Sequence, residues 1–236
     1  MKYFELTCVA YLKRDLSFKD SFEVIAKYIS FAMANDLLLR ELHFKSGYKY
    51  YVFNNFYPIE QDKVYKKGNS YTFKIRSLHK GFIEVISKKL RENINNPNFL
   101  VVEAKSKEIK EFFIKELYSV TPVISTTNEG HYWTIQKDGD ILKLQKLLQD
   151  NLEKKYYDFY KEKLKPTCNF IQLLELKNQK PQSIWSSKNG KSFRFFGNKY
   201  KIIPNEDEVS QKLAFLALGA GLGEKNTFGG GFLISR

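Results

Sequence analysis

The sequence predicts an α+β protein in which a strand–helix–strand–strand–helix–strand order occurs twice. Three observations support this prediction: short runs of aromatic and β-branched residues, amphipathic segments between them, and a hydrophobic fraction of 43% in 236 residues. A chain of this length and composition can bury one large core or two small ones. It is therefore neither a disordered tail nor a disulfide miniprotein.

The first unit opens at residues 3–11, where aromatic and β-branched residues predict a strand. A helix follows, with Ser21 as its N-cap and apolar residues at helical spacing from Phe22 to Leu37. Residues 42–47 are predicted to form a loop. The unit is completed by strands at 48–53 and 71–78, a helix with its apolar stripe at 82–90, and a strand at 99–104.

The second unit repeats this order without repeating the sequence. Residues 113–127 are predicted to be extended, with a break at Pro122, and residues 131–136 to be their hairpin partner. The remaining elements are a helix at 141–160, strands at 170–176 and 183–203 with a turn at Lys188-Asn189-Gly190, a helix at 209–216 and a strand at 232–235. Both units have the order of the ferredoxin-like fold, so we predict two tandem ferredoxin-like domains, at residues 1–110 and 111–236.

The charge of the chain points to a polyanionic partner. Lys and Arg number 39 against 26 Asp and Glu, which leaves a net charge of +13. Such an excess attracts nucleic acid over long distances. Aromatic residues make up 16% of the chain, and some of these rings are available to stack on bases. Nucleic acid is therefore the first partner to consider.

Cysteine content and hydropathy narrow the setting of the chain. Cys8 and Cys168 are too few, even with three histidines, to build a structural zinc site, so we expect no metal and no cofactor. The longest apolar stretch without a charge, residues 213–223, is far shorter than the roughly 20 residues that span a bilayer. Glu5 interrupts the apolar start and no cleavage site follows it, which argues against a signal peptide. We expect a cytoplasmic protein without membrane contact.

The most specific local pattern lies at residues 219–232, which hold six of the 13 glycines. A loop without Cβ atoms can bring successive backbone N–H groups against a phosphate, and Lys225 would add a positive charge. The run lacks the Gly-x-x-x-x-Gly-Lys-Ser/Thr pattern of nucleotide-binding loops, and Asn226 stands where the dinucleotide fingerprint requires its third glycine. The alternative interpretation is a connector, which is disfavoured because apolar segments flank the run.

A short Ala- and Leu-rich helix, then Gly-Leu-Gly, Lys-Asn, a second Gly-x-Gly and a C-terminal apolar strand resembles the CRISPR repeat-processing endoribonucleases of the RAMP superfamily. The resemblance covers the whole chain in architecture and is most specific in the glycine-rich run. It implies an RNase that needs no metal and cuts within each repeat of precursor CRISPR RNA (pre-crRNA). It also implies attack by a 2′-hydroxyl, which leaves 2′,3′-cyclic phosphate and 5′-hydroxyl ends. The RNA-binding residues that it implies in the run are Gly221, Gly223, Lys225, Asn226, Gly229, Gly230 and Gly231.

The same resemblance directs attention to the segment after the first helix, where such enzymes place their general acid or base. It implies catalytic roles for Tyr28, His43 and Lys49. An imidazole titrates near neutrality and can serve either proton transfer of RNA cleavage, while a lysine can stabilise the negative phosphorane. A tyrosine can hydrogen-bond the phosphate. The resemblance also allows a homodimer and contacts with other subunits of a CRISPR interference complex.

Each of these three residues has a structural alternative. His43 can hydrogen-bond a loop carbonyl, Tyr28 suits a core position beside the apolar stripe equally well, and a lysine such as Lys49 is usually solvated. Two further histidines remain candidates for the general acid or base. They are His79, at a strand-to-helix junction, and His131, at a hairpin turn.

A basic, aromatic hairpin is the second candidate RNA contact. Residues 177–204 carry seven Lys or Arg residues and no acidic residue. Alternation along a hairpin can turn the rings inward and the cations outward, towards an RNA backbone, and we single out Lys188, Lys191 and Arg194 for this role. The alternative is a lysine-rich edge that keeps the sheet soluble.

The sequence leaves three functional interpretations, of which a repeat-processing endoribonuclease is preferred. The second is a non-catalytic RNA-binding subunit of the same superfamily that holds guide RNA in an interference complex. The third, a tandem RNA-binding protein related to RRM domains, is disfavoured. Neither half contains the Lys/Arg-Gly-Phe/Tyr-Gly/Ala-Phe-Val signature of those domains.

Overall fold

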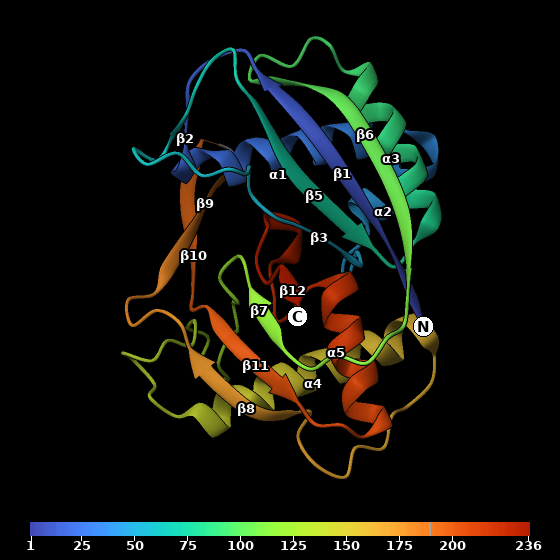
Figure 1. Ribbon diagram of the computed structural model, residues 1–236, viewed down its shortest axis with the longest axis vertical. Coiled ribbons are helices and arrows are strands. Elements are labelled where there is room, and N and C mark those ends of the chain that lie inside the picture. Colours follow the sequence, from blue (N-terminus) through green and yellow to red (C-terminus); the bar gives the residue numbers. More distant parts are fainter. Residues whose placement is uncertain (189) are drawn as a thin grey trace.

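Two four-stranded β-sheets form the frame of the protein, whose computed structural model describes residues 1–188 and 190–236 (Figure 1). In the first sheet the strand order is β3-β5-β1-β6, and in the second it is β12-β7-β11-β8. Every pairing is antiparallel. Each order places the first and third strands of its unit at the centre, which is the arrangement of the ferredoxin-like fold. The prediction of two such units is confirmed.

Alternation along the central strand builds the N-terminal core. Every second side chain of β1 (Lys2–Leu12) points inward, and Leu6, Cys8 and Ala10 are fully buried. Apolar stripes of two helices cover them, because Ile25 and Ile86 belong to the same buried cluster. The other elements of this unit are α1 (Phe18–Ala34), α2 (Leu37–Phe44), β3 (Tyr51–Phe53), β5 (Ser70–Ser77), α3 (Lys80–Glu92) and β6 (Phe99–Lys110), with a small sheet of β2 (Leu16–Ser17) and β4 (Val64–Tyr65).

The segment after the first helix differs from its prediction. Helix α1 begins at Phe18 and is capped by Ser17, whereas Ser21 is buried and its hydroxyl donates to the Phe18 carbonyl. The predicted loop at 42–47 was wrong over its first residues, because α2 continues to Phe44. The Asp36 carboxylate starts that helix by accepting hydrogen bonds from two backbone N–H groups.

The C-terminal unit contains β7 (Leu117–Ser119), α4 (Ile141–Tyr160), β8 (Ile171–Leu176), β11 (Tyr200–Pro204), α5 (Glu208–Ala220) and β12 (Leu233–Ser235). In the predicted extended run at 113–127 only β7 is a strand, and residues 131–136 form no strand, although Thr126 and Tyr132 keep the predicted hairpin pairing as an isolated antiparallel bridge. On either side of this bridge Trp133 N donates to Ser125 O and Thr127 N donates to His131 O, and the rest of the segment is irregular. The buried indole of Trp133 satisfies the apolar pattern without a strand.

A hairpin of β9 (Gln182–Lys188) and β10 (Lys191–Gly197) is inserted between β8 and β11. Figure 1 shows it rising from the C-terminal unit to α1 of the N-terminal unit. Ser187 contacts that helix, since it donates to Glu23 and accepts from Lys27 Nζ. The predicted turn includes Asn189, which lies outside the described residues.

The two units share a polar and aromatic interface. Arg76 Nη1 donates to Leu218 O (3.2 Å) and Leu233 O (2.6 Å), while its Nε lies 2.7 Å from Glu5 Oε2. Burial raises the pKa of Glu5, but Arg76 and Lys74 outweigh it and hold that pKa at about 2. Strand β6 ends at Lys110, and the division of the chain at this residue stays a prediction.

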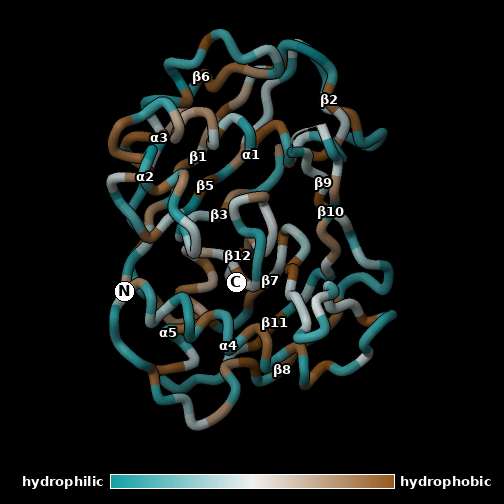
Figure 2. Tube along the Cα trace, turned by 180° about the vertical axis from the view of Figure 1, so that it is seen from behind, coloured by the Kyte–Doolittle hydropathy of each residue, from teal (hydrophilic) through white to brown (hydrophobic). Residues whose placement is uncertain are grey.

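Hydropathy follows these layers. In Figure 2, viewed from behind, the outermost loops are mostly hydrophilic, while hydrophobic segments gather along the inner strands and helices. Helix α5 is the most buried helix and packs against β1 and β5 as well as β11 and β12. Within the described ranges, no helix combines the length and the hydropathy that a membrane span requires.

Candidate functional site

A cavity of about 270 Å³ lies between residues 47–51 and the glycine-rich loop. Residues 47–51 lead into β3 of the N-terminal unit, and the glycine-rich loop follows α5 of the C-terminal unit. The two units therefore form the site together. Its lining residues are Gly47, Tyr48, Lys49, Tyr50, Tyr51, Lys155, Ala220, Gly223, Glu224, Lys225, Asn226, Thr227 and Phe228. Three lysines and a carboxylate thus surround a hollow with aromatic walls.

Lys49 lines this cavity, and His43 lies outside its lining. The Lys49 ammonium donates a hydrogen bond to the backbone carbonyl of His43, in the last turn of α2. Burial lowers the pKa of Lys49. Burial and then the positive charge of Lys49 lower the pKa of His43 from its usual value, so its imidazole is neutral at pH 7. Lys49 therefore contacts the main chain of His43, and its positive charge acts on the imidazole of that residue.

Tyr28 occupies a different place. Its side chain is 2% exposed, and its hydroxyl donates to the carbonyls of Leu90 and Asn93. Its ring packs edge-on against Phe99 at 4.8 Å. Burial raises the pKa of this phenol well above its usual value. Tyr28 therefore matches the core interpretation of that residue, and its position does not support a catalytic role.

His79 lies outside the lining of the cavity. It caps α3 without a side-chain hydrogen bond, and its ring packs against Tyr50 (5.7 Å) and Phe159 (5.0 Å). Burial and the charge of Lys45 lower its pKa. Its surroundings are those of a histidine in an aromatic cluster.

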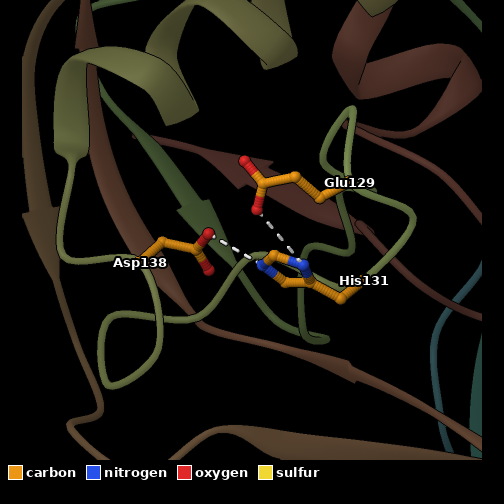
Figure 3. A group of neighbouring side chains, drawn as sticks. All are labelled: Glu129, His131 and Asp138. Carbon is orange, nitrogen blue, oxygen red and sulfur yellow. Dashed lines mark hydrogen bonds and ion pairs between the residues drawn. The ribbon is translucent and has the colours of Figure 1, made fainter.

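His131 lies between two carboxylates in the loop before α4 (Figure 3). Its Nε2 is 2.9 Å from Asp138 Oδ1, and its Nδ1 is 3.6 Å from Glu129 Oε2. Among the residues that the structure describes, this is the one group of three metal-ligating side chains. The carboxylates lie at opposite ring nitrogens, Thr134 N donates to Asp138, and Lys143 pairs with Glu129. Both ring nitrogens and both carboxylates are engaged by neighbours within the loop, so the arrangement is that of a hydrogen-bonded loop.

The glycines of the glycine-rich loop permit close packing before anything else. A Cβ on Gly231 would overlap the Leu222 carbonyl oxygen, and a Cβ on Gly229 would lie 2.6 Å from the Phe22 ring. Both residues have positive φ, which costs other residue types free energy. Side chains at Gly221, Gly223 and Gly230 would also press on their neighbours.

Most of the glycine N–H groups in the loop are therefore not free to bind a ligand. The N–H groups of Gly221, Gly229, Gly230 and Gly231 donate to backbone carbonyls within the fold. Across residues 1–188 and 190–236, the N–H groups of Lys225, Asn226 and Thr227 meet no acceptor, and these three residues line the cavity. Of the predicted residues, Gly223, Lys225 and Asn226 thus keep backbone N–H groups for a ligand at the cavity, and Thr227 joins them.

Lys155 is a site residue that the sequence analysis missed. It lies on α4 with 2% of its side chain exposed, and its Nζ donates to three oxygen atoms of the glycine-rich loop. Its position was a usable signal, because it falls three residues after Leu152 on the apolar stripe of the helix. Tyr48 and Glu224 also line the cavity and were not predicted.

The hairpin presents its charges to solvent. Lys188, Lys191 and Arg194 are exposed, whereas Ile184 and Phe195 on the inner face are buried. The Arg194 guanidinium lies over the rings of Trp185 (5.2 Å) and Phe196 (4.8 Å), so these two rings share the outer face with it. The inner Phe195 ring lies 4.9 Å from that of Phe228 in the glycine-rich loop.

Comparison with known proteins agrees with this architecture. The family model described as CRISPR associated protein Cas6, C-terminal, matches residues 102–234. The chain belongs to the Cas6 family. The resemblance to CRISPR-associated proteins of the RAMP superfamily is thereby confirmed.

Relatives match over almost the whole chain. A curated protein from Methanocaldococcus jannaschii, CRISPR-associated endoribonuclease Cas6 2, is 25% identical over 94% of this chain and 95% of its own. A solved structure described as CRISPR associated protein Cas6 has a TM-score of 0.72 at 21% identity and covers 99% of both chains. Another, described as an RAMP protein binding different RNA substrates, has a TM-score of 0.70 at 16% identity with the same coverage. These structures share the Cas6 fold.

Proposed function

We propose that the protein is an endoribonuclease that binds CRISPR repeat RNA and cleaves within the repeat to release guide RNAs. The observation that carries the proposal is the position of Lys49, which lines the cavity beside the glycine-rich loop and donates to the main-chain carbonyl of His43. Membership of the Cas6 family and the net charge of +13 support the same substrate.

The proposed reaction uses the two side chains in different steps. The neutral His43 imidazole takes the proton of the ribose 2′-hydroxyl, and the 2′-oxygen attacks the adjacent phosphorus. The Lys49 ammonium stabilises the phosphorane and, with its lowered pKa, gives a proton to the departing 5′-oxygen. The P–O5′ bond breaks, which leaves a 2′,3′-cyclic phosphate and a 5′-hydroxyl. Exchange with water restores both protonation states, and the internal nucleophile makes a metal ion unnecessary.

RNA binding is proposed to use two surfaces. The exposed Lys188, Lys191 and Arg194 of the hairpin attract the RNA backbone, and the rings beside Arg194 can stack on bases. The turn of Lys225, Asn226 and Thr227 offers free N–H groups and an ammonium to a phosphate at the cavity. The homodimer, the other interference-complex subunits and the cytoplasmic location stay predictions.

A cleavage assay tests the proposal. Repeat RNA labelled at one end is incubated with the protein in EDTA, beside the same RNA carrying a 2′-deoxy substitution at the cut site. We expect one cut that survives EDTA and disappears with the deoxy substrate. Replacement His43→Ala should slow cleavage by roughly 10² to 10⁴ with nearly unchanged affinity, because it removes a general base.

The matched control is His131→Ala, which removes an imidazole that does not line the cavity. A cut that is equally fast in His43→Ala would move the base to another residue. Tight binding of repeat RNA with no cut would instead identify a carrier subunit of the same family.

A further inference from the structure

Lys155 is the one lysine within the described residues whose side chain is fully enclosed by the fold. Its Nζ lies 2.8 Å from Gly221 O, 2.7 Å from Gly223 O and 2.8 Å from Asn226 Oδ1. An ammonium has three N–H donors, so this cage uses all of them. Every ligand oxygen comes from the glycine-rich loop, although the lysine belongs to α4.

The cage also orients the amide of Asn226. Because Asn226 Oδ1 accepts from Lys155, its Nδ2 is turned to the other side, where it donates to Leu222 O (3.3 Å) and Gly230 O (2.9 Å). One side chain thus ties the beginning of the glycine-rich loop to its end. Loss of the Lys155 ammonium would remove the hydrogen bond that fixes which way the Asn226 amide is turned.

The free donors of the loop follow from this arrangement. The turn of Lys225, Asn226 and Thr227 starts from a left-handed residue, since Lys225 has a φ of +57°. The Asn226 amide, held by Lys155 and two carbonyls, keeps the turn in place beside the cavity. A buried charge is retained in a core only where its hydrogen bonds are complete, as they are here.

We propose that Lys155 is a positioning residue for RNA binding: its ammonium replaces a bound cation at the centre of the glycine-rich loop and holds the turn of Lys225, Asn226 and Thr227 against the RNA backbone. This inference rests on the proposed function for the identity of the ligand. The Lys155 ammonium makes its three hydrogen bonds within the loop, so the inference assigns it no hydrogen bond to the RNA.

The protonation state of Lys155 adds a pH dependence. Burial lowers the pKa of Lys155 to about 7, and the charge of Glu224 opposes that shift. The charged or titratable groups that face it are Glu224 and Lys225 of the loop, Tyr48, Lys49 and Tyr50 of the opposite wall, and Asp158 of its own helix. A neutral amine has only two N–H donors, so one contact of the cage is lost as the pH rises through 7. RNA affinity should fall over the same interval.

The experiment compares Lys155→Met with Lys154→Met, its exposed neighbour on α4. Methionine keeps an unbranched side chain that is one heavy atom shorter, and it removes the donors. We expect Lys155→Met to weaken repeat-RNA binding by about tenfold or more, because it removes three hydrogen bonds to a charged group. Its cleavage rate at saturating RNA should stay within about threefold of wild type, and Lys154→Met should bind as wild type does. Equal affinity in a folded Lys155→Met would overturn the inference.

Two further measurements cover the case in which Lys155→Met does not fold. Wild-type affinity is measured from pH 6 to 8.5 in the His43→Ala background, where a fall of about threefold to tenfold around pH 7 is expected and a flat profile would contradict the proposal. Amide hydrogen exchange of residues 221–231 in the free wild-type protein should accelerate beyond its intrinsic pH dependence over the same range. Binding without cleavage would count against the proposed reaction alone, while an exchange rate without this extra acceleration would count against Lys155.

Discussion

The glycine-rich loop and the β9–β10 hairpin were both predicted to contact RNA, and the structure uses them in opposite ways. Leu222 and Phe232 at the two ends of the loop are buried, and its glycines fit against backbone and aromatic rings. At the hairpin tip Lys188 and Lys191 are exposed. A cluster of glycines marks close approach of backbone, whatever the ligand, whereas a run of lysines marks a surface.

The two regions are nevertheless in contact. Phe228 of the loop packs against Phe195 and Phe193 on the inner face of the hairpin, with ring centroids 4.9 and 6.3 Å apart. The loop therefore packs against the inner face of the hairpin. Changes in the loop should affect stability first, and changes on the outer face of the hairpin should affect RNA binding alone.

The largest difference is expected between two glycine substitutions. Gly231 (φ +72°) and Gly190 (φ +75°) have nearly the same backbone conformation, but a Cβ meets nothing within 4 Å at Gly190 and overlaps a carbonyl at Gly231. Gly190→Ala should cost about 1 kcal/mol, the strain of a left-handed residue. Gly231→Ala should cost about 3 kcal/mol or more, because a steric clash is added. Urea unfolding of both variants measures the difference, and equal costs would show that the loop is free to open.

The next effect concerns the charges of the hairpin. The combined replacement Lys188→Ala, Lys191→Ala and Arg194→Ala should weaken repeat-RNA binding by roughly tenfold to a hundredfold. It should also make the salt dependence shallower, reducing the magnitude of the slope of log affinity against log salt by about 2. Stability should change by less than about 0.5 kcal/mol per residue, because all three are exposed. Fluorescence anisotropy at several salt concentrations gives both quantities.

The matched control is Lys80→Ala with Lys88→Ala on α3, where two exposed lysines lie away from the hairpin. An equal loss in this control would mean that net charge, and not the hairpin, attracts the RNA.

The smallest effect is a separation of cleavage from binding by pH. The pKa of His43 is lowered from 6.5, so its basic form dominates above that value and is lost only as the pH falls through the lower pKa. The cleavage rate should therefore hold from pH 7 to 6.5 and then fall by up to about tenfold per unit at lower pH. The lysines and arginine of the hairpin stay charged throughout, so RNA affinity should not fall. Single-turnover kinetics gives the cleavage rate, and fluorescence anisotropy gives the RNA affinity. An equal loss of both as the pH falls would contradict the assignment of cleavage to His43 and of binding to the hairpin.

Much of the fold could be predicted because periodicity records burial. The helices at 82–90 and 141–160 and the strand at 170–176 recur as α3, α4 and β8 with small changes at their ends. Helix α2 could not be found in this way, because Leu37, Leu38 and Phe44 are exposed and only Leu39 is buried. Its start depends on the Asp36 cap and its place on the packing against α1.

The candidate site was predictable only in part. His43 and Lys49 came from a resemblance and lie together, but Tyr28 does not join them, because its helix turns the hydroxyl to the Leu90 carbonyl. Most of the glycines predicted to donate to a ligand also lack a free N–H group in the structure. Hydrogen bonds within the fold occupy most glycine N–H groups, and no sequence pattern states which groups are already paired.

The sequence by itself determined the tandem α+β architecture, the basic surface of the hairpin and the presence of a tight glycine loop. These features depend on local periodicity, charge and backbone freedom, which neighbouring residues encode. The tertiary structure alone decided that Lys155 lies inside the glycine-rich loop. Its contacts join residues up to 71 positions apart, so they exist only once α4 and the glycine-rich loop have packed within the C-terminal unit.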